Sequence, residues 1–147
     1  VSPYAQRALL DGVEVARGEA RVVFNLSPGR PHHIQLEHAC CFPWVRDFGA
    51  GEAFPPEIKA RLQPRPARLR VEGEPSARVY VNDALAGTAG DSQRAPLEVA
   101  VPPTGASPYE AQAELRVEID GRPPLRAPLK LRAGADVTFA VPAQGAP

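Results

Sequence analysis

Apolar residues alternate with polar ones in short runs through the second half of the chain. Six runs show the alternation, with apolar residues at 69 and 71, 79 and 81, 97 to 101, 115 to 119, 129 and 131, and 137 to 141. Successive side chains of a strand point to opposite faces, so this period predicts strands with one buried face. We therefore expect six short strands between residues 68 and 142.

Turn residues separate these runs, and prolines exclude long helices. Asn82-Asp83, the Pro-Pro-Thr-Gly stretch at 102–105, Asp120-Gly121 and Ala133-Gly134 are typical of turns, and the last is expected to close a hairpin. The 147 residues include 18 prolines, and each one inside a helix costs about 3 kcal/mol. The fold class predicted is all-β.

The first half of the chain repeats the same pattern with different loop lengths. Segments 3–12, 21–28, 33–38 and 58–62 match segments 75–84, 96–103, 116–121 and 125–129, at offsets of 72, 75, 83 and 67. The pattern predicts two tandem antiparallel β-sandwich domains, residues 1–66 and 67–147. The stretch PARLRVEGEP, which begins at residue 66, is interpreted as a strand shared by both repeats, which predicts a stiff pair.

The segment LRVEGEPSARVYVNDALAGTA, residues 69–89, resembles the PEGA family. Leu69 and Val71 match its first strand, Pro75 and Ala77 its naming motif, Val79 and Val81 its second strand, and Gly87-Thr88 the following turn. In the first half, LLDG and PGRPHHIQL are similar to the Asp-Gly turn and the His-containing strand of the family, with His32, Ile34 and Leu36 on that strand and a spacing one residue longer. The chain lacks the glycine between Pro75 and Ala77, and Ala89 stands where proline is usual.

The resemblance covers most of the chain and implies small sandwiches of the immunoglobulin/prealbumin-like kind. Such domains belong to bacterial envelope proteins and to the outer parts of membrane-spanning Ser/Thr kinases, where they bind surface-layer material. The resemblance therefore implies an extracytoplasmic location in the periplasm or at the cell surface. It implies no catalytic residue and no cofactor.

Charge and hydropathy exclude two classes of partner. Lys and Arg total 17 and Asp and Glu also total 17, with no run of one sign, so the field that attracts nucleic acid is missing. No apolar run approaches the roughly 20 residues of a membrane-spanning helix. We expect a soluble fragment or mature form with no nucleic-acid partner. The resemblance to PEGA domains implies that the parent protein is membrane-associated.

The stretch HHIQLEHACCFPW, residues 32–44, is dense in histidine and cysteine. If Ile34 and Leu36 face the core, strand periodicity places His32, His38 and Cys40 on their side, and His33 and Cys41 on the other. Two ligands on one face bind zinc weakly, and a thiol nucleophile needs a third group to orient its base. We expect no metal and no enzyme activity, with His32 capping a strand end, His38 at a strand edge, and the cysteines packed as small apolar residues.

Aromatic residues concentrate directly after this stretch. Phe42, Trp44, Phe48 and Phe54 lie in CCFPWVRDFGAGEAFPP, which we interpret as a loop added to the repeat, because the matching GRPPLR is shorter. Phe42 and Trp44 could cover an open end of the sandwich, or the loop could expose Trp44 and Phe48 to a protein or a sugar. The candidate binding residues are Phe42, Trp44, Arg46, Asp47 and Phe48.

These observations favour a non-catalytic extracytoplasmic binding or spacer module. It would dock or present a larger bacterial envelope protein to a protein or polysaccharide partner. The alternatives are the sensory domain of a transmembrane Ser/Thr kinase and a metal- or thiol-dependent site built on His38, Cys40 and Cys41.

Overall fold

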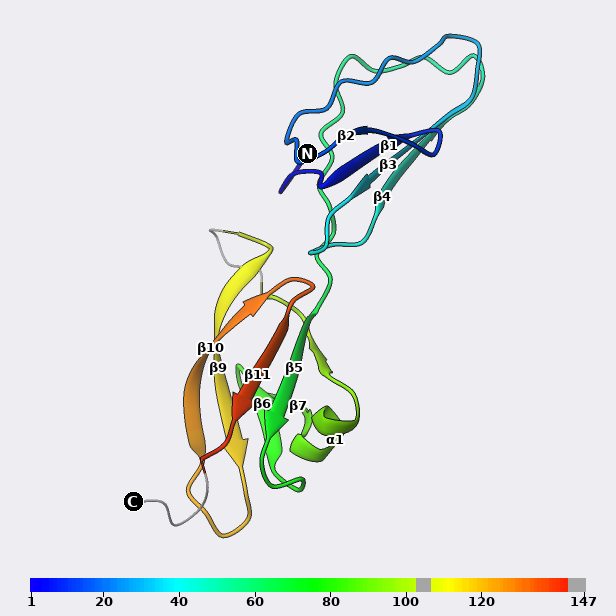
Figure 1. The fold of residues 1–147 in the computed structure, drawn as a ribbon. Helices are drawn as coiled ribbons and strands as arrows, with labels where there is room; N and C mark the ends of the chain where they lie inside the picture. Colours follow the sequence, from blue (N-terminus) through cyan, green and yellow to red (C-terminus); the bar gives the residue numbers. More distant parts are fainter. Residues whose placement is uncertain (103–106, 143–147) are drawn as a thin grey trace. The chain divides into compact units, whose positions relative to one another are not determined.

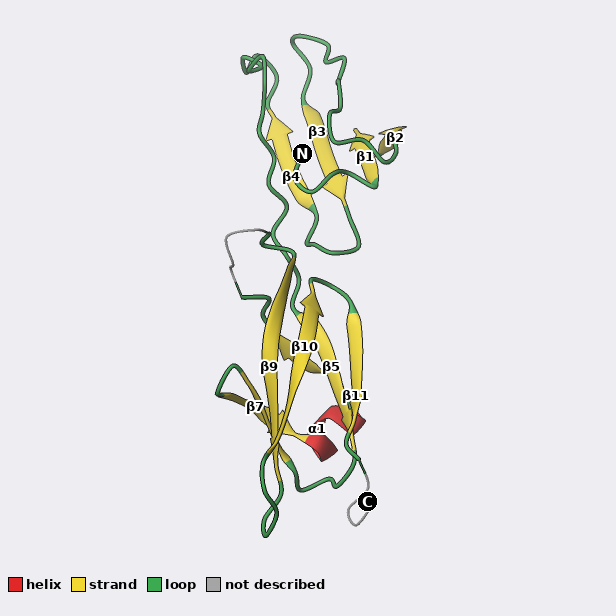
Figure 2. Cartoon of the chain, turned by 90° about the vertical axis from the view of Figure 1, so that its left-hand side faces the viewer, coloured by secondary structure: helices red, strands yellow, loops and turns green. Residues whose placement is uncertain are grey.

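The computed structural model describes residues 1–102 and 107–142, and their regular structure is almost entirely β-strand (Figures 1 and 2). The elements are β1 (Arg7–Leu10), β2 (Val13–Ala16), β3 (His32–Glu37), β4 (Trp44–Phe48), β5 (Ala67–Glu72), β6 (Arg78–Val81), β7 (Ala84–Thr88), α1 (Ala89–Arg94), β8 (Leu97–Val99), β9 (Glu110–Glu118), β10 (Leu125–Arg132) and β11 (Asp136–Ala140). The predicted all-β class is confirmed. The only helix in these ranges has six residues, so no helix there could cross a membrane.

The chain divides into two compact units, unit 1 (residues 1–64) and unit 2 (residues 65–147). The expected boundary, between residues 66 and 67, lies two residues further along the chain. β5 pairs with β8 and β11, both of which are in unit 2. The interpretation of this segment as a strand shared by two repeats is therefore wrong.

Unit 1 contains one antiparallel sheet in the order β2-β1-β3-β4 (Figure 1). The β1–β2 hairpin turns at Asp11 and Gly12, whose φ angles of 52° and 82° explain the Asp-Gly pair. Alternate residues of β3 are buried, with Ile34 and Leu36 each 3% exposed. This face of the sheet carries the core of unit 1.

Segments 17–31 and 49–64 cross unit 1 without forming regular strands (Figure 2). The strands expected at 21–28 and 58–62 are therefore absent from this fully described unit. These segments form only isolated β-bridges, such as those of Ser2 with Arg61 and of Cys41 with Pro64. Alternation of apolar residues in the two segments was not enough to form strands, because a strand also requires neighbours that pair along its length.

Unit 2 has two sheets, in the orders β10-β9-β6-β7 and β11-β5-β8. One contiguous core fills the space between them, made of Ala67, Leu69, Val71, Ala77, Val79, Val81, Ala89, Ala113, Leu115, Val117, Leu129 and Leu131. Among the described residues of unit 2, all strand pairings are antiparallel except that of β11 with β5. The architecture of this unit is that of a β-sandwich.

The six strands predicted in this part of the chain are present, and two elements were missed. β7 lacks a regular apolar alternation, and α1 is short and is capped by Thr88, whose hydroxyl accepts a hydrogen bond from the Asp91 amide. The Ala133-Gly134 turn does not close a hairpin, because β11 crosses to the other sheet and runs parallel to β5. Residues 103–106, most of the turn expected at 102–105, lie outside the described residues.

The four-stranded sheets of the two units have the same connectivity. β1, β2, β3 and β4 occupy the places that β6, β7, β9 and β10 occupy in unit 2. The pairing partners Leu36 and Trp44 are eight positions apart, as are Val117 and Leu125. The aromatic segment therefore contains strand β4 in a hairpin of the same length, and its interpretation as an added loop is wrong.

Candidate functional site

The five predicted binding residues lie on and just before β4, at the edge of the unit 1 sheet. Trp44, Arg46 and Phe48 alternate along one face of the strand, whereas Asp47 belongs to the other. Phe48 is only 2% exposed, with the Arg46 guanidinium 5.0 Å from its ring centre. These side chains therefore do not form one surface, and Phe48 belongs to the core.

The residues that remain accessible follow the edge of the sheet. Phe42 is 46% exposed, Val45 is 48% exposed, and both Arg46 and Asp47 are exposed. In the described part of the chain β4 pairs with a strand on one side only, that of β3. An open strand edge beside apolar side chains is a surface that can receive a partner.

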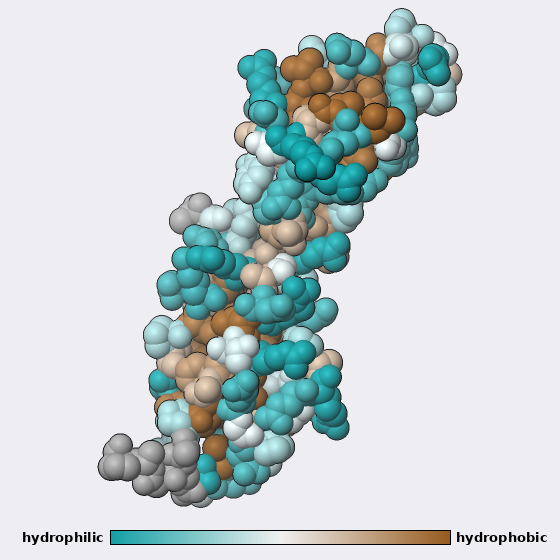
Figure 3. Space-filling view, in the orientation of Figure 1, coloured by the Kyte–Doolittle hydropathy of each residue, from teal (hydrophilic) through white to brown (hydrophobic). Residues whose placement is uncertain are grey.

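A groove of about 1050 Å³ lies on the core face of the same sheet, and we call it the unit 1 groove. Ile34, Leu36, Trp44 and Phe48 line it from β3 and β4. Segments 20–24 and 54–61 line it as well. Apolar side chains of unit 1 are visible at the molecular surface in the space-filling view (Figure 3). Sequence reasoning missed this groove, because its lining comes from segments far apart in the chain.

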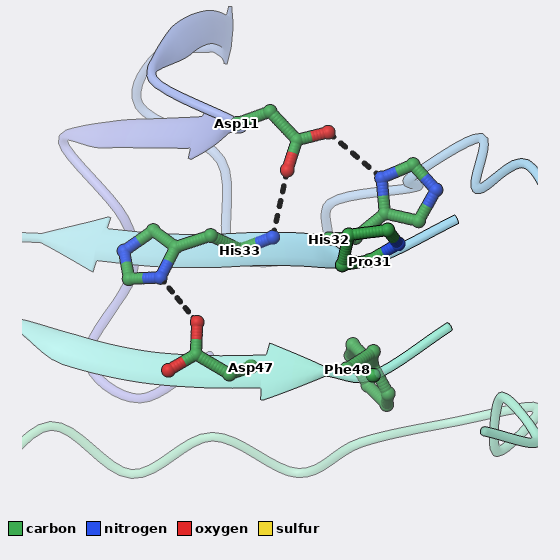
Figure 4. Close-up of a pocket in the computed structure, with 7 residues that line it drawn as sticks. Asp11, Pro31, His32, His33, Asp47 and Phe48 are labelled. Carbon is green, nitrogen blue, oxygen red and sulfur yellow. Dashed lines mark hydrogen bonds and ion pairs between the residues drawn. The ribbon is translucent and has the colours of Figure 1, made fainter. Parts of the chain in front are cut away.

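One end of the sheet carries a buried histidine that is paired with a carboxylate (Figure 4). His32 begins β3, is 8% exposed, and places Nδ1 2.7 Å from Oδ2 of Asp11 in the β1–β2 turn. The other oxygen of Asp11 accepts a hydrogen bond of 2.7 Å from the His33 amide. The hydrogen bond to Asp11, and a second to the Ser27 backbone, raise the pKa of His32, while the pKa of Asp11 is lowered. Asp11 was recognised in the sequence as a turn residue, but its carboxylate was not expected to bind His32.

His33 projects to the opposite face of the strand and binds Asp47 of β4. Its Nδ1 lies 2.5 Å from Oδ1 of Asp47, and this hydrogen bond raises the pKa of His33. Both histidines line a shallow hollow of about 460 Å³ at this end of the sheet (Figure 4). The His32–Asp11 pair joins β3 to the β1–β2 turn, and the His33–Asp47 pair joins β3 to β4. Each imidazole is hydrogen-bonded to a carboxylate rather than directed at a nucleophile.

The third histidine lies beside the two cysteines. β3 ends at Glu37, and the turn that follows brings one ligand atom each of His38, Cys40 and Cys41 within 4.8 Å of one another. The expectation that Cys41 faces away from His38 is wrong, because strand periodicity stops where the strand ends. His32 and His33 do not join this group.

Cys40 and Cys41 form a disulfide with each other. This bond corrects the expectation that adjacent cysteines pack separately as small apolar residues. Nδ1 of His38 accepts a hydrogen bond of 2.9 Å from the Cys40 amide, and partial burial lowers the pKa of His38. A disulfide offers no thiolate, so zinc binding or nucleophilic attack here requires prior reduction.

A comparison with protein-family models, curated proteins and solved structures gives no match for this chain. The resemblance to PEGA domains therefore rests on the sequence motifs. The following proposals rest on the geometry of the two units together with those motifs.

Proposed function

We propose that the chain is a non-catalytic binding and spacer module that docks a larger bacterial envelope protein to a protein or polysaccharide partner. The observation that carries this proposal is the outer edge of β4, which pairs with no strand in the described part of the chain. Val45 is 48% exposed there beside the charged Arg46 and Asp47, and the side chain of Phe42, 46% exposed, lies just before the strand. Exposed apolar side chains next to charged ones along a strand edge suit recognition of an extended or ring-shaped ligand. The site comprises Phe42, Val45, Arg46 and Asp47, which we call the β4 edge.

The contacts of the reactive side chains support a non-catalytic role. His32 and His33 hold Asp11 and Asp47, and the two sulfurs are bonded to each other. Each of these interactions links neighbouring parts of unit 1, and this supports a structural role for these side chains.

Two observations support an extracytoplasmic location and a tandem PEGA-like organisation. Disulfides persist in oxidising compartments such as the periplasm, and this chain carries one between Cys40 and Cys41. The shared connectivity of the two four-stranded sheets is what descent from one duplicated unit would leave.

A binding experiment with a matched control tests the β4 edge. The double variant Phe42→Ala, Val45→Thr alters the edge, and Val15→Thr alters a valine of similar exposure, 47%, on the opposite edge strand β2. The probes are purified peptidoglycan sacculi in a co-sedimentation assay and a phage-displayed peptide library. We expect one probe to bind the wild-type chain, with binding reduced at least about tenfold in the double variant, retained in Val15→Thr, and with little change of Tm in either.

Two outcomes contradict the proposal. One is that neither probe is retained by the wild-type chain. The other is an equal loss in both variants, which would place binding outside the β4 edge.

A further inference from the structure

The turn that follows β3 brings together three side chains that are ligands for thiophilic metal ions. His38, Cys40 and Cys41 place one ligand atom each within 4.8 Å of one another. In the described part of the chain, no other three histidine, cysteine or carboxylate side chains are placed to hold one ion. An imidazole with two sulfurs is a donor set that suits zinc and copper(I).

The bond between the two sulfur atoms closes this donor set. Cys40 and Cys41 are joined as a disulfide. Metal ions bind cysteine as the thiolate, and a disulfide has no thiolate to offer. The oxidation state of the cysteine pair therefore decides whether the three side chains can act as ligands.

The spacing of the three side chains suits a metal ion once the disulfide is reduced. Zinc lies about 2.3 Å from sulfur and about 2.0–2.1 Å from nitrogen in a tetrahedral site, which sets the ligand atoms about 3.6–3.8 Å apart. The ligand atoms of the turn are already within 4.8 Å of one another. Rotation of the side chains therefore brings the two sulfurs and the ring nitrogen to the required separation.

Contacts other than the disulfide hold the turn in place. The Cys41 amide donates a hydrogen bond of 3.0 Å to the His38 carbonyl, and the Ala39 amide donates one of 2.7 Å to the side-chain oxygen of Gln6. The His38 ring packs edge-on against Tyr4, with 4.6 Å between the ring centres. A disulfide between adjacent residues closes a very small ring and constrains the unfolded chain little. We expect the turn to keep its shape after reduction.

His38 presents a ring nitrogen that carries a lone pair. Nδ1 of His38 accepts a hydrogen bond of 2.9 Å from the Cys40 amide, so this nitrogen is unprotonated and directed at the cysteine turn. A histidine ligand requires such a nitrogen. A metal ion bound at Nδ1 takes the place of the amide hydrogen.

We propose that the reduced Cys40–Cys41 pair and His38 form a redox-gated site for one thiophilic cation such as Zn²⁺. In the oxidised chain the site is closed by the disulfide. In the reduced chain two thiolates and one imidazole bind the cation, and its fourth coordination position is open to water. This site is independent of the β4 edge.

A dithiol reductant opens the site by thiol–disulfide exchange. Its thiolate attacks Sγ of Cys40, the less buried of the two sulfur-bearing residues, and the bond between the cysteines breaks to release Cys41 as a thiolate. The second thiol of the reductant then attacks the mixed disulfide and releases Cys40. The cysteine pair gains two electrons, the reductant becomes a disulfide, and cation binding leaves both cysteines without their protons.

Metal titration of the 147-residue chain in both oxidation states tests the site. The chain is reduced with dithiothreitol, separated from it under argon, and titrated with Zn²⁺ against a chromophoric chelator. A parallel titration with Cd²⁺ follows the ultraviolet charge-transfer band of cadmium bound to thiolate.

Three variants separate the contributions of the ligands. His38→Asn removes the imidazole, while the asparagine oxygen can still accept the hydrogen bond from the Cys40 amide. His33→Asn is the matched control, because His33 binds Asp47 and lies outside the group. The double variant Cys40→Ser, Cys41→Ser removes both thiolates and cannot form the disulfide.

We expect the reduced wild-type chain and reduced His33→Asn to bind one Zn²⁺ per chain and to show the cadmium band. His38→Asn should bind Zn²⁺ at least about tenfold more weakly, because even residues behind the ligands have effects of that size. The oxidised chain and the double serine variant should bind neither ion. The amide spectrum of unit 1 should stay that of a folded protein after reduction.

Four results would overturn the proposal. The reduced chain could fail to bind either ion, or the oxidised chain could bind Zn²⁺ as tightly as the reduced one, which would exclude thiolate ligands. Equal affinities of His38→Asn and His33→Asn would exclude the imidazole. Unfolding of unit 1 on reduction would show that the turn cannot hold the ligands without the disulfide.

Discussion

The imidazole of His32 is hydrogen-bonded at both ring nitrogens. Nδ1 donates to Asp11, and Nε2 lies 3.0 Å from both the amide nitrogen and the carbonyl oxygen of Ser27. A neutral ring accepts from the Ser27 amide, and a protonated ring donates to the Ser27 carbonyl, so this buried side chain is satisfied in either state. His32 therefore fastens the segment before β3 to the β1–β2 turn.

This pair predicts a pH dependence of the stability of unit 1. The pKa of folded His32 is raised above 6.5 by Asp11, so its stabilising contribution is complete below pH 6.5 and is lost as the pH rises through the higher pKa of the folded state. His33, whose pKa Asp47 raises, contributes in the same direction. We expect the Tm of unit 1 to fall as the pH rises above 6.5.

Asp11→Asn isolates the buried pair, because asparagine also tolerates the positive φ of this turn. The decline of Tm with pH should be smaller in Asp11→Asn, and Asp47→Asn should reduce it by a lesser amount, because the His33–Asp47 pair is more exposed to solvent. His38 does not affect this measurement. Burial lowers its pKa, so its contribution to the stability of unit 1 changes mainly below pH 6.5. An unchanged slope in Asp11→Asn, measured by calorimetry across this range, would rule out the pair as its source.

Helix α1 is tied to the smaller sheet of unit 2 by one buried serine. The Ser92 hydroxyl accepts a hydrogen bond of 2.9 Å from the Val71 amide and lies 2.7 Å from the Ala89 carbonyl, to which it donates. Ser92 is fully buried. The Ser92 side chain thus accepts a hydrogen bond from the Val71 amide of β5, at a position that the short strand β8 does not reach.

Ser92→Ala should lower the free energy of unfolding of unit 2 by about 1–3 kcal/mol, because it leaves a buried amide without a partner. The corresponding fall in Tm is about 4–8 °C for each kcal/mol in a unit of this size. Ser76→Ala is the control, since Ser76 is exposed and its loss should change Tm little. Equal melting curves for the two variants would contradict this role of Ser92.

At the scale of the whole molecule, the two units differ in how completely their cores are covered. Unit 2 places its core between two sheets. Unit 1 has one sheet, with irregular segments and the unit 1 groove on its core face. Less apolar surface is removed from water in unit 1, and we infer that it is the less stable of the two.

This difference predicts two thermal transitions in the 147-residue chain, with unit 1 unfolding first. Residues 65–147 prepared alone should fold and melt within about 3 °C of the second transition, because their core is contained in that unit. Differential scanning calorimetry of the chain and the fragment provides the measurement. A single cooperative transition, or a fragment that does not fold, would show that the two units depend on each other.

Local patterns in the chain were sufficient to predict six of the seven described strands of unit 2, all but β7, and several turns. Leu69 and Val71, or Leu115 and Val117, alternate with polar residues, and a strand buried on one face imposes that period directly. The Asp-Gly turn in unit 1 was visible for a similar reason, because its positive φ angles restrict the residue types. These features depend on neighbours in sequence.

Pairing between distant segments required the tertiary structure. The sequence pattern did not predict β4, because the face of this strand that carries Trp44 and Phe48 also carries the charged Arg46. The parallel pairing of β11 with β5 joins residues almost 70 positions apart, such as Asp136 and Arg68. The contacts of His32 with Asp11, and of His38 with the cysteines, likewise arise where a turn and the end of a strand meet. Alternation tells which face of a strand is apolar, but only the three-dimensional arrangement decides what covers that face, and in unit 1 part of it remains open as a groove.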